Sequence, residues 1–323
     1  MDGLVQVRTP TYRRPGALRR ALGSIMSQSW PHWVVDVYDD DPDQTGRSVV
    51  EALGDERVRY HPNVPQRYAS RNIDACFSGA NPNDADYFCV VEDDNFLLPG
   101  FMAENIALCR ERGVEIVLRN QLIEHASGTA GAHLSAGGVL DGLFIEATYA
   151  PEHFRMSLLV GIGVSNGGLF WSRHARSRLE IGFPCTATMQ EYLRTFSIAE
   201  PVHVAMTPLA VWAENAEQTT RNAELAASYL RRELDLKRQI QALQRIVWNQ
   251  SPAAARQRFL TDPRFVPPAA DRAKSLTKAL IPHVPIDLAP GVAIEMALRG
   301  VAIRALGRLS PEFQPFIESR RDA

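Results

Sequence analysis

Residues 87–95 read YFCVVEDDN, a mostly apolar run that turns acidic from one residue to the next. An unbroken run of this kind is typical of a strand buried on both faces of a parallel sheet. In open sheets built from such strands, ligands bind beyond the carboxyl ends of the strands. The position of Glu92, Asp93 and Asp94 directly after the run therefore places three carboxyl groups where a ligand site is expected.

The sequence before this stretch alternates strand and helix patterns. Apolar residues at helical spacing indicate a helix that begins near Pro15, and the threonines and proline at 9–11 are expected to end the strand before it. The other expected elements are strands at 4–7, 33–38 and 58–60 and helices at 48–53 and 66–77. This alternation predicts βαβ units and a Rossmann-like, mostly parallel sheet flanked by helices, an α/β fold.

The pattern changes twice further along the chain. Beyond residue 113 it is mixed, with a Gly-rich loop expected at 127–138, a strand at 168–171 and a helix at 189–196. Beyond residue 220 only helices with Pro-rich joints are expected. We therefore divide the chain into residues 1–112, 113–220 and 221–323.

Charge separates the last of these parts from the rest. The whole chain has 35 Lys and Arg against 37 Asp and Glu, a net charge of −2 that gives no support to nucleic-acid binding. Residues 1–220 carry 18 basic and 27 acidic residues, whereas residues 221–323 carry 17 basic and 10 acidic. An acidic front and a basic tail predict different roles for the two parts.

The tail is expected to pack mainly on the protein itself. Apolar residues of 223–248 follow a heptad-like spacing, for which packing on the chain's own core is the favoured interpretation and dimerisation the alternative. Residues 292–309 predict a second helix, for which contact with an anionic membrane is an alternative to packing. We expect a cytoplasmic protein, with peripheral contact at the inner face of the membrane as a further option. The four cysteines lack metal-binding or disulfide spacing, which fits reduced core thiols.

Five stretches together resemble the family 2 glycosyltransferases. They are VRTPTY at 7–12, LGSIMSQ at 22–28, VYDD at 37–40, YASRN at 68–72 and VVEDDNFLLPGF at 90–101. Their order and spacing are similar to those of the family over residues 4–220. The resemblance implies the GT-A fold, with a nucleotide-sugar-binding half at 1–112, an acceptor-binding half at 113–220 and a helical C-terminal extension at 221–323.

The resemblance also implies a set of donor-binding residues. Pro10, Thr11 and Tyr12 would line the base pocket, and Asp39 would accept the imide hydrogen of a uracil or thymine. Arg71 would lie near the nucleotide, with Arg67 one helical turn earlier as its competitor. The structural alternative for both arginines is a surface ion pair with Asp74 or a nearby carboxylate.

The acidic stretch would complete the donor site. Asp93 would hold the ribose hydroxyls, and Asp94 would bind a Mn²⁺ or Mg²⁺ ion that bridges the two phosphates. A hard divalent ion is chemically reasonable there, because crowded carboxylates repel one another unless a cation compensates them.

Members of the family invert the sugar, so the resemblance implies a general base for the acceptor hydroxyl. Glu191 is the candidate, and a carboxylate that only serves the helix dipole is the alternative. Glu180 is a poorer candidate, because it is expected in a solvated helix. Asn166, Gly167 and Gly168 would contact the acceptor or the sugar, the alternative for the glycines being a bulge.

The sequence thus predicts an inverting, metal-dependent enzyme that moves a sugar from a UDP- or dTDP-sugar to a hydroxyl acceptor. The acceptor, whether a glycan, a lipid-linked intermediate or a natural product, is not encoded in any readable motif. A sugar-phosphate nucleotidyltransferase is a weaker alternative, because no glycine follows the first strand until Gly16. A catalytically degenerate scaffold that acts through its tail is the third hypothesis.

Overall fold

A computed structural model describes residues 3–161, 164–215, 226–281 and 288–320. Its centre is one sheet with the strand order β3-β2-β1-β4-β9-β6-β10-β5, with β7 paired to β6 and β8 to β10 at its margins. The strands are β1 Val5–Thr11, β2 Trp33–Asp39, β3 Val58–Pro62, β4 Tyr87–Val90, β5 Phe96–Leu97, β6 Ile116–Ser127, β7 His133–Gly138, β8 Ala147–Tyr149, β9 Leu169–Ser172 and β10 Val202–Asn215.

The first part of the sheet is parallel, as the sequence predicts. β1 pairs in parallel with both β2 and β4, and β2 with β3. β9 is antiparallel to β4 and to β6, and it joins this part to the parallel pair β6 and β10. One continuous sheet therefore spans both halves that the sequence analysis separates at residue 112.

Two local expectations are wrong. The first strand does not end at Val7, before the threonines and proline at 9–11, but continues to Thr11, because all residues of Val5–Thr11 pair with β2. Residues 133–138 form β7, which returns antiparallel to β6, where a Gly-rich loop was expected. A third expectation is corrected in extent, since the helix predicted at 66–77 is only α3, Ala69–Ala75.

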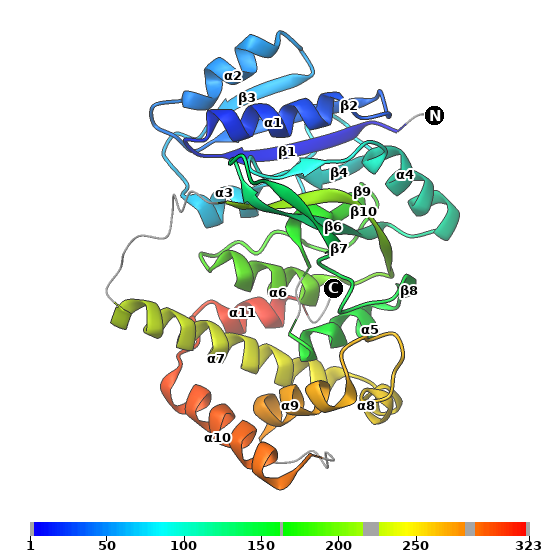
Figure 1. Cartoon of the computed structure of the whole chain (residues 1–323), viewed down its shortest axis with the longest axis vertical. Helices are drawn as coiled ribbons and strands as arrows, with labels where there is room; N and C mark the ends of the chain where they lie inside the picture. Colours follow the sequence, from blue (N-terminus) through cyan, green and yellow to red (C-terminus); the bar gives the residue numbers. More distant parts are fainter. Residues whose placement is uncertain (1–2, 162–163, 216–225, 282–287, 321–323) are drawn as a thin grey trace.

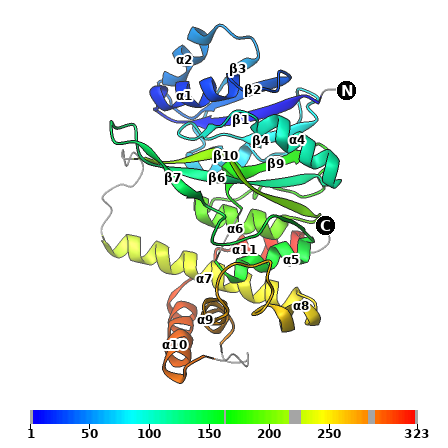
Figure 2. The ribbon, with the colours of Figure 1, turned by 45° about the vertical axis from the view of Figure 1, so that its right-hand side comes forward.

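Helices cover both faces of the sheet (Figure 1). One face is covered by α1 (Pro15–Met26), α2 (Thr45–Leu53) and α4 (Phe101–Arg112), whose apolar residues share a core with β1 and β2. The other face carries α3, α5 (Pro151–Arg155) and α6 (Ala187–Ser197). Turned by 45°, the molecule shows the C-terminal helices stacked beyond this second face (Figure 2).

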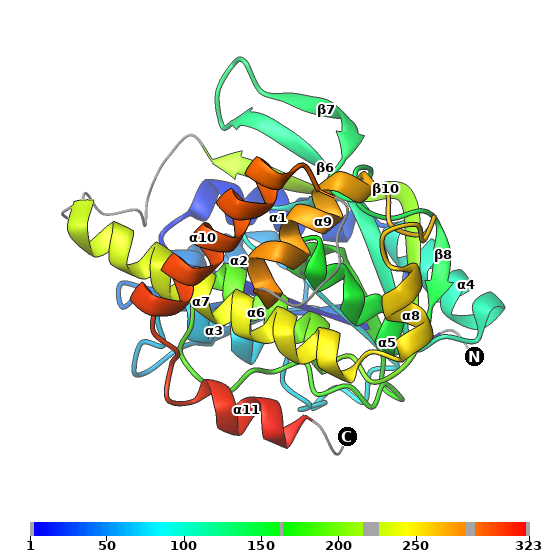
Figure 3. The ribbon, with the colours of Figure 1, turned by 90° about the horizontal axis from the view of Figure 1, so that it is seen from below.

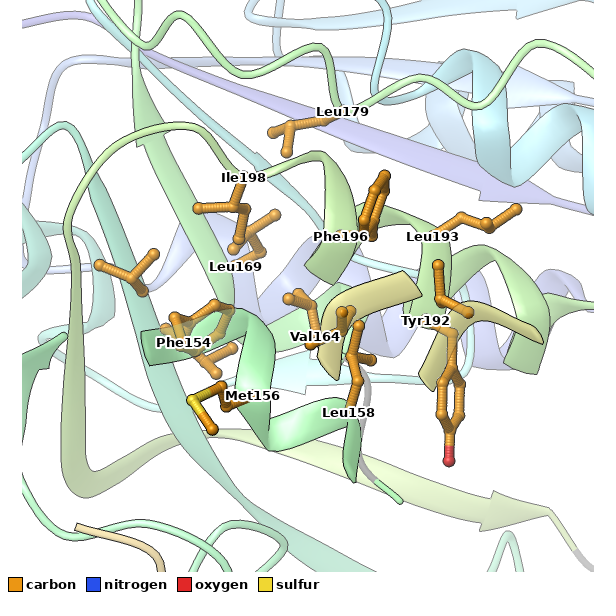
Figure 4. Close-up of a cluster of buried hydrophobic side chains, with 14 of the residues drawn as sticks. Phe154, Met156, Leu158, Val164, Leu169, Leu179, Tyr192, Leu193, Phe196 and Ile198 are labelled. Atoms are coloured by element: carbon orange, nitrogen blue, oxygen red, sulfur yellow. The ribbon is translucent and has the colours of Figure 1, made fainter. Parts of the chain in front are cut away.

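The second core lies between the sheet and α6. Leu193 and Phe196 of α6 pack there with Phe154 and Met156 from the segment around α5 (Figure 4). These side chains are all at most 1% exposed. Full burial of one such side chain contributes about 1.5–3 kcal/mol, so this core fixes α6 rigidly against the sheet.

The C-terminal helices continue this core outward. They are α7 (Ala226–Gln250), α8 (Ala253–Arg258), α9 (Ala269–Leu280), α10 (Pro290–Leu306) and α11 (Phe313–Ser319). Leu243 and Val247 of α7 are buried in the second core, which confirms that this stripe packs on the chain itself, whereas Tyr229 is 57% exposed. The predicted boundary at residue 220 lies outside the described residues.

Among the described residues, no helix combines the length and the apolar character needed to cross a membrane. All four cysteines are described and unpaired, and Cys76, Cys89 and Cys109 are buried, as expected for core thiols.

Candidate active site

The carboxyl ends of β1, β2 and β4 lie next to one another. Thr11 is opposite Asp39 across the β1–β2 pair, and β4 flanks β1 on its other side. The carboxylate of Asp93 accepts a hydrogen bond from Thr11 Oγ1 at 2.8 Å and one from the backbone N–H of Tyr12 at 3.2 Å. The structure therefore brings together the first and fourth strand ends, from which the sequence predicts a donor site.

Asp93 and Asp94 share one arginine. Arg14, which precedes α1, places Nη1 3.5 Å from Asp93 Oδ1 and also pairs with the carboxylate of Asp94. Burial raises the pKa of Asp93 to about 6, against the opposing effect of the Arg14 charge. The sequence analysis did not single out Arg14 and missed its ion pair with Asp94, which is 80 residues away.

Asn166 links the acidic stretch to α6. Its side-chain amide donates to Glu92 Oε1 at 3.4 Å, and its backbone N–H donates to Glu191 Oε1 at 3.3 Å. Burial, the Asp94 charge and the Glu191 charge raise the pKa of Glu92 to about 8. Glu191, although 99 residues further along the chain, therefore lies beside the carboxyl groups that follow β4.

Glu191 is held in the first turns of α6. The Thr186 hydroxyl caps this helix by accepting the N–H of Met189 at 3.2 Å. Burial raises the pKa of Glu191 to about 7, although the hydrogen bond from Asn166 and the Arg194 charge act in the opposite direction. A carboxyl group that titrates near neutrality is suited to accept a proton under physiological conditions.

Arg194 organises the surroundings of Glu191. It lies three residues later on α6, is fully buried, and donates to Asn166 Oδ1 at 2.7 Å and to Asp74 Oδ1 at 2.8 Å. It also donates to the backbone oxygen of Leu179 at 3.1 Å. Sequence reasoning missed this residue, although an arginine on an otherwise apolar helix face is a signal that could have revealed it.

The segment 166–168 has an internal role that the sequence did not reveal. The Asn166 side chain is buried and already bonded to Glu92 and Arg194. A Cβ on Gly167 would come 2.7 Å from Gln121 Nε2, and one on Gly168 would come 2.4 Å from the backbone oxygen of Arg119. Close packing against the backbone of β6 thus requires Gly168, whereas a side chain at Gly167 would displace the end of the Gln121 side chain. Contact of 166–168 with acceptor or sugar stays a prediction.

The carboxylate of Asp39 is already hydrogen-bonded within the protein. It is 0% exposed, and its oxygens accept from the N–H of Asp41 at 2.9 Å, the N–H of Gly46 at 3.0 Å and the hydroxyl of Tyr60 at 2.8 Å. A base imide could reach the remaining acceptor position only if the residues that cover this carboxylate moved. The geometry supports a role in fixing the turn after β2, and base recognition by Asp39 stays a prediction without support from these contacts.

The neighbouring Asp40 anchors the segment that leads into α3. It accepts the N–H of Arg67 at 2.6 Å and the N–H of Tyr68 at 2.7 Å. Tyr68 has a positive φ of 65° and a side chain that is 69% exposed. These bonds hold the 67–68 backbone beside the strand ends.

Arg67 and Arg71 project at the edge of this site. Both are exposed, and within the described residues neither forms an ion pair. The alternative of an ion pair with Asp74 is wrong, because Asp74 pairs with the buried Arg194. The two guanidinium groups are therefore available to an anionic ligand.

The acidic stretch offers a partial metal site. Among the described residues, no group of three or more His, Cys, Asp or Glu is arranged to hold a metal ion. Glu92, Asp93 and Asp94 nevertheless lie close together beside the guanidinium group of Arg14. The residues thus fit a hard divalent ion held by Asp94 together with oxygens of the ligand, and do not fit an all-protein cage.

The sequence of this region matches a known family model. Residues 7–133 match the model described as "Glycosyl transferase family 2". These residues form a family 2 glycosyltransferase domain. The match includes β1, β2, β4 and the acidic stretch, and it ends before Asn166 and Glu191.

Solved structures of other proteins are similar to this chain over nearly its whole length. The structure of S. aureus TarS 1-349 has a TM-score of 0.54 at 12% sequence identity, over 99% of this chain and 87% of that one. The same protein in complex with UDP-GlcNAc has a TM-score of 0.55 at 13% identity, again over 99% and 87%. At such low identity the likeness establishes the GT-A fold alone. No curated protein matches the sequence.

Proposed function

We propose that this glycosyltransferase moves a sugar from a UDP- or dTDP-sugar to a hydroxyl acceptor with inversion, using Glu191 as the general base. The observation that carries the proposal is the position of Asn166, which donates to Glu191 Oε1 at 3.3 Å and to Glu92 Oε1 at 3.4 Å. The carboxyl group of Glu191, whose pKa is about 7, therefore lies beside the acidic stretch that follows β4.

The donor would lie across the ends of β1 and β4. Thr11 and Tyr12 border the pocket for the base, Asp93 lies within reach of ribose hydroxyls, and the diphosphate faces Asp94 and the exposed Arg67 and Arg71. The family match supports a nucleotide-sugar donor, and S. aureus TarS, which shares the fold, binds UDP-GlcNAc. A uracil or thymine base remains the favoured choice on the family resemblance.

The transfer itself is a single displacement. The acceptor oxygen forms a bond to the anomeric carbon while the bond from that carbon to the diphosphate oxygen breaks, and Glu191 takes the acceptor proton. The leaving diphosphate keeps the electron pair of the broken bond, and Arg67 and Arg71 offer positive charge to it. Because attack comes from the face opposite the leaving group, the configuration of the sugar inverts.

A divalent ion would act at Asp94. When bound, such an ion neutralises charge on the leaving diphosphate as a Lewis acid. Arg14 pairs with the same carboxylate, so an ion at Asp94 would compete with this pair or share the carboxylate with it. Asp94 would supply one oxygen ligand and the diphosphate would supply others.

A ligand panel tests the donor half of the proposal. Thermal stability is measured with UDP, dTDP, GDP and ADP and their sugars, each with Mn²⁺ and with a chelator. We expect stabilisation that is selective for uridine or thymidine nucleotides and larger with the metal, because a ligand that binds only the folded state raises its stability. Equal stabilisation by all the nucleotides would contradict the donor assignment, and so would a lack of stabilisation by any of them.

A further inference from the structure

A second cavity lies in the C-terminal helices, away from the strand ends. It has a volume of about 580 Å³ and is lined by α7, α9 and α10 with Val160, Gly161 and Tyr192. Seen from below, α7, α9 and α10 form the outermost layer of the molecule (Figure 3). The apolar part of the lining comes from Leu234, Ile240, Met296 and Ile303. The cavity therefore has room for a ligand that is partly apolar.

All three lysines of the protein line this cavity. The sequence has 35 Lys and Arg, of which only Lys237, Lys274 and Lys278 are lysines. Lys237 comes from α7 and the other two from α9, and Arg299 of α10 joins them. Among the described residues that line the cavity, Asp271 is the only acidic one.

The cations are not fully compensated. Lys274 lies 2.8 Å from Asp271, Arg299 lies 2.6 Å from Glu295 and Lys237 lies 3.7 Å from Glu233. Lys278 has no ion pair within the part of the chain that the structure describes. Burial lowers the pKa of Lys278, and the charges of Lys237 and Arg299 lower it further. The cluster carries an excess of positive charge that an anion would relieve.

An exposed apolar strip runs along the same helix that closes the cavity. Ile294, Leu298 and Val301 of α10, at positions i, i+4 and i+7, are 61%, 64% and 49% exposed. Arg299 and Ala302, next to Leu298 and Val301 in the chain, line the cavity. A helix that presents apolar side chains beside a cluster of cations has the features of an element lying at a membrane interface.

We propose that the cavity binds the phosphate headgroup of an anionic phospholipid, while Ile294, Leu298 and Val301 enter the bilayer surface. The three lysines and Arg299 recognise the phosphate, and the apolar lining accommodates the beginning of the acyl chains. A lipid fits better than a free phosphate, because an inorganic anion would leave both the apolar lining and the exposed strip without contacts. This site is separate from the donor site at the strand ends.

Vesicle flotation with the full chain tests the proposal. The two vesicle types are phosphatidylcholine alone and phosphatidylcholine with phosphatidic acid. We expect binding only to the second type, weakened about fivefold by each of Lys278→Gln and Arg299→Gln and about 25-fold by both, since one cation near an anionic surface contributes about 1 kcal/mol. Leu298→Ser should weaken binding without changing its dependence on phosphatidic acid.

Controls separate this site from general charge and from the transferase site. Arg112→Gln on α4 removes one exposed cation outside the cavity and should leave flotation unchanged. Melting temperature and stabilisation by UDP should be the same in all variants, because none of these residues lies at the strand ends. This binding does not depend on donor or acceptor, so its failure would leave the proposed transfer reaction untouched.

Three results would overturn the proposal. The first is equal flotation of the wild type and the Lys278→Gln/Arg299→Gln variant. The second is a lack of binding to vesicles with phosphatidic acid. The third is binding of inorganic pyrophosphate, in calorimetry, as tight as that of a short-chain phosphatidic acid, which would assign the cavity to a soluble anion.

Discussion

Replacing Glu191 by glutamine tests the assignment of the general base most directly. Glutamine keeps the size of the side chain and an oxygen that can accept the Asn166 N–H, but it cannot take a proton. We expect the turnover of a UDP-sugar, measured as UDP release with water as acceptor, to fall about 10²–10⁴-fold. Binding of UDP should stay within about twofold, because Glu191 acts on the acceptor and not on the nucleotide.

The pH dependence follows from the raised pKa of Glu191. With a pKa of about 7 in the free enzyme, the carboxyl group is protonated at lower pH and cannot act as a base. The wild-type kcat/KM should therefore rise with pH and reach half of its plateau near pH 7. The Glu191→Gln variant should lack this rising limb.

Ionisation of Glu191, which enables it to act as a base, lowers the free energy of unfolding. Its pKa rises from about 4.5 to about 7 on folding, so the ionised form is disfavoured in the folded protein. At 1.36 kcal/mol per pH unit, the cost is near zero below pH 4.5 and grows to about 3 kcal/mol above pH 7. The free energy of unfolding of Glu191→Gln should thus exceed that of the wild type at pH 8 by up to this amount, and equal it at pH 4.5.

Glu180→Gln is the matched control. It makes the same change on a more exposed side chain, which lies outside the contacts of Asn166 and whose pKa is raised by partial desolvation of the carboxyl group and by the Asp74 charge. We expect turnover within about twofold of the wild type. If Glu191→Gln kept more than a tenth of the turnover together with the rising limb near pH 7, Glu191 would not be the base.

Three further predictions concern other parts of the molecule. Asp94→Asn should lose the additional thermal stabilisation that Mn²⁺ gives in the presence of UDP, while the melting temperature of the free protein stays within a few degrees of the wild type. If the metal dependence of UDP binding in calorimetry is unchanged, Asp94 does not bind the metal ion. Arg194→Met should lower the free energy of unfolding in urea by about 3–5 kcal/mol, since it leaves Asp74 buried without its partner, and a loss below about 1 kcal/mol would contradict the network. A chain that ends at residue 225 should be insoluble, because it exposes the core that Leu243, Val247 and Phe313 cover, and a soluble product would show that the helices are separable.

The sequence predicted the elements whose signal is local. β1, β2 and β4 follow from short apolar runs, and the position of the acidic stretch after β4 follows from the change of pattern at Glu92. The helical tail and its inward stripe at Leu243 and Val247 also follow from residue spacing. The hairpin of β6 and β7 was missed because its glycines are as compatible with a loop as with an exposed strand.

Contacts between distant residues carried no such signal. Arg14 reaches Asp94 across 80 positions and Arg194 reaches Asp74 across 120, and neither pair follows from local periodicity. Glu180, expected in a helix, lies in an irregular segment between β9 and α6. The sequence indicated which side chains could carry the chemistry. Only the structure shows which of them are already hydrogen-bonded within the protein.

This distinction affects how the nucleotide base of the donor would be recognised. Asp39 is fully buried and accepts hydrogen bonds from Asp41, Gly46 and Tyr60, which lie in the turn after β2, in α2 and in β3. An ionised carboxylate has about four acceptor positions, so one position remains, but a nucleotide base could reach it only if the residues that cover Asp39 moved. Recognition by backbone groups near Thr11 and Tyr12 avoids that rearrangement. If Tyr60→Phe lowers the melting temperature but leaves the preference for UDP over GDP intact, Asp39 stabilises the turn and the base is selected by the β1 end.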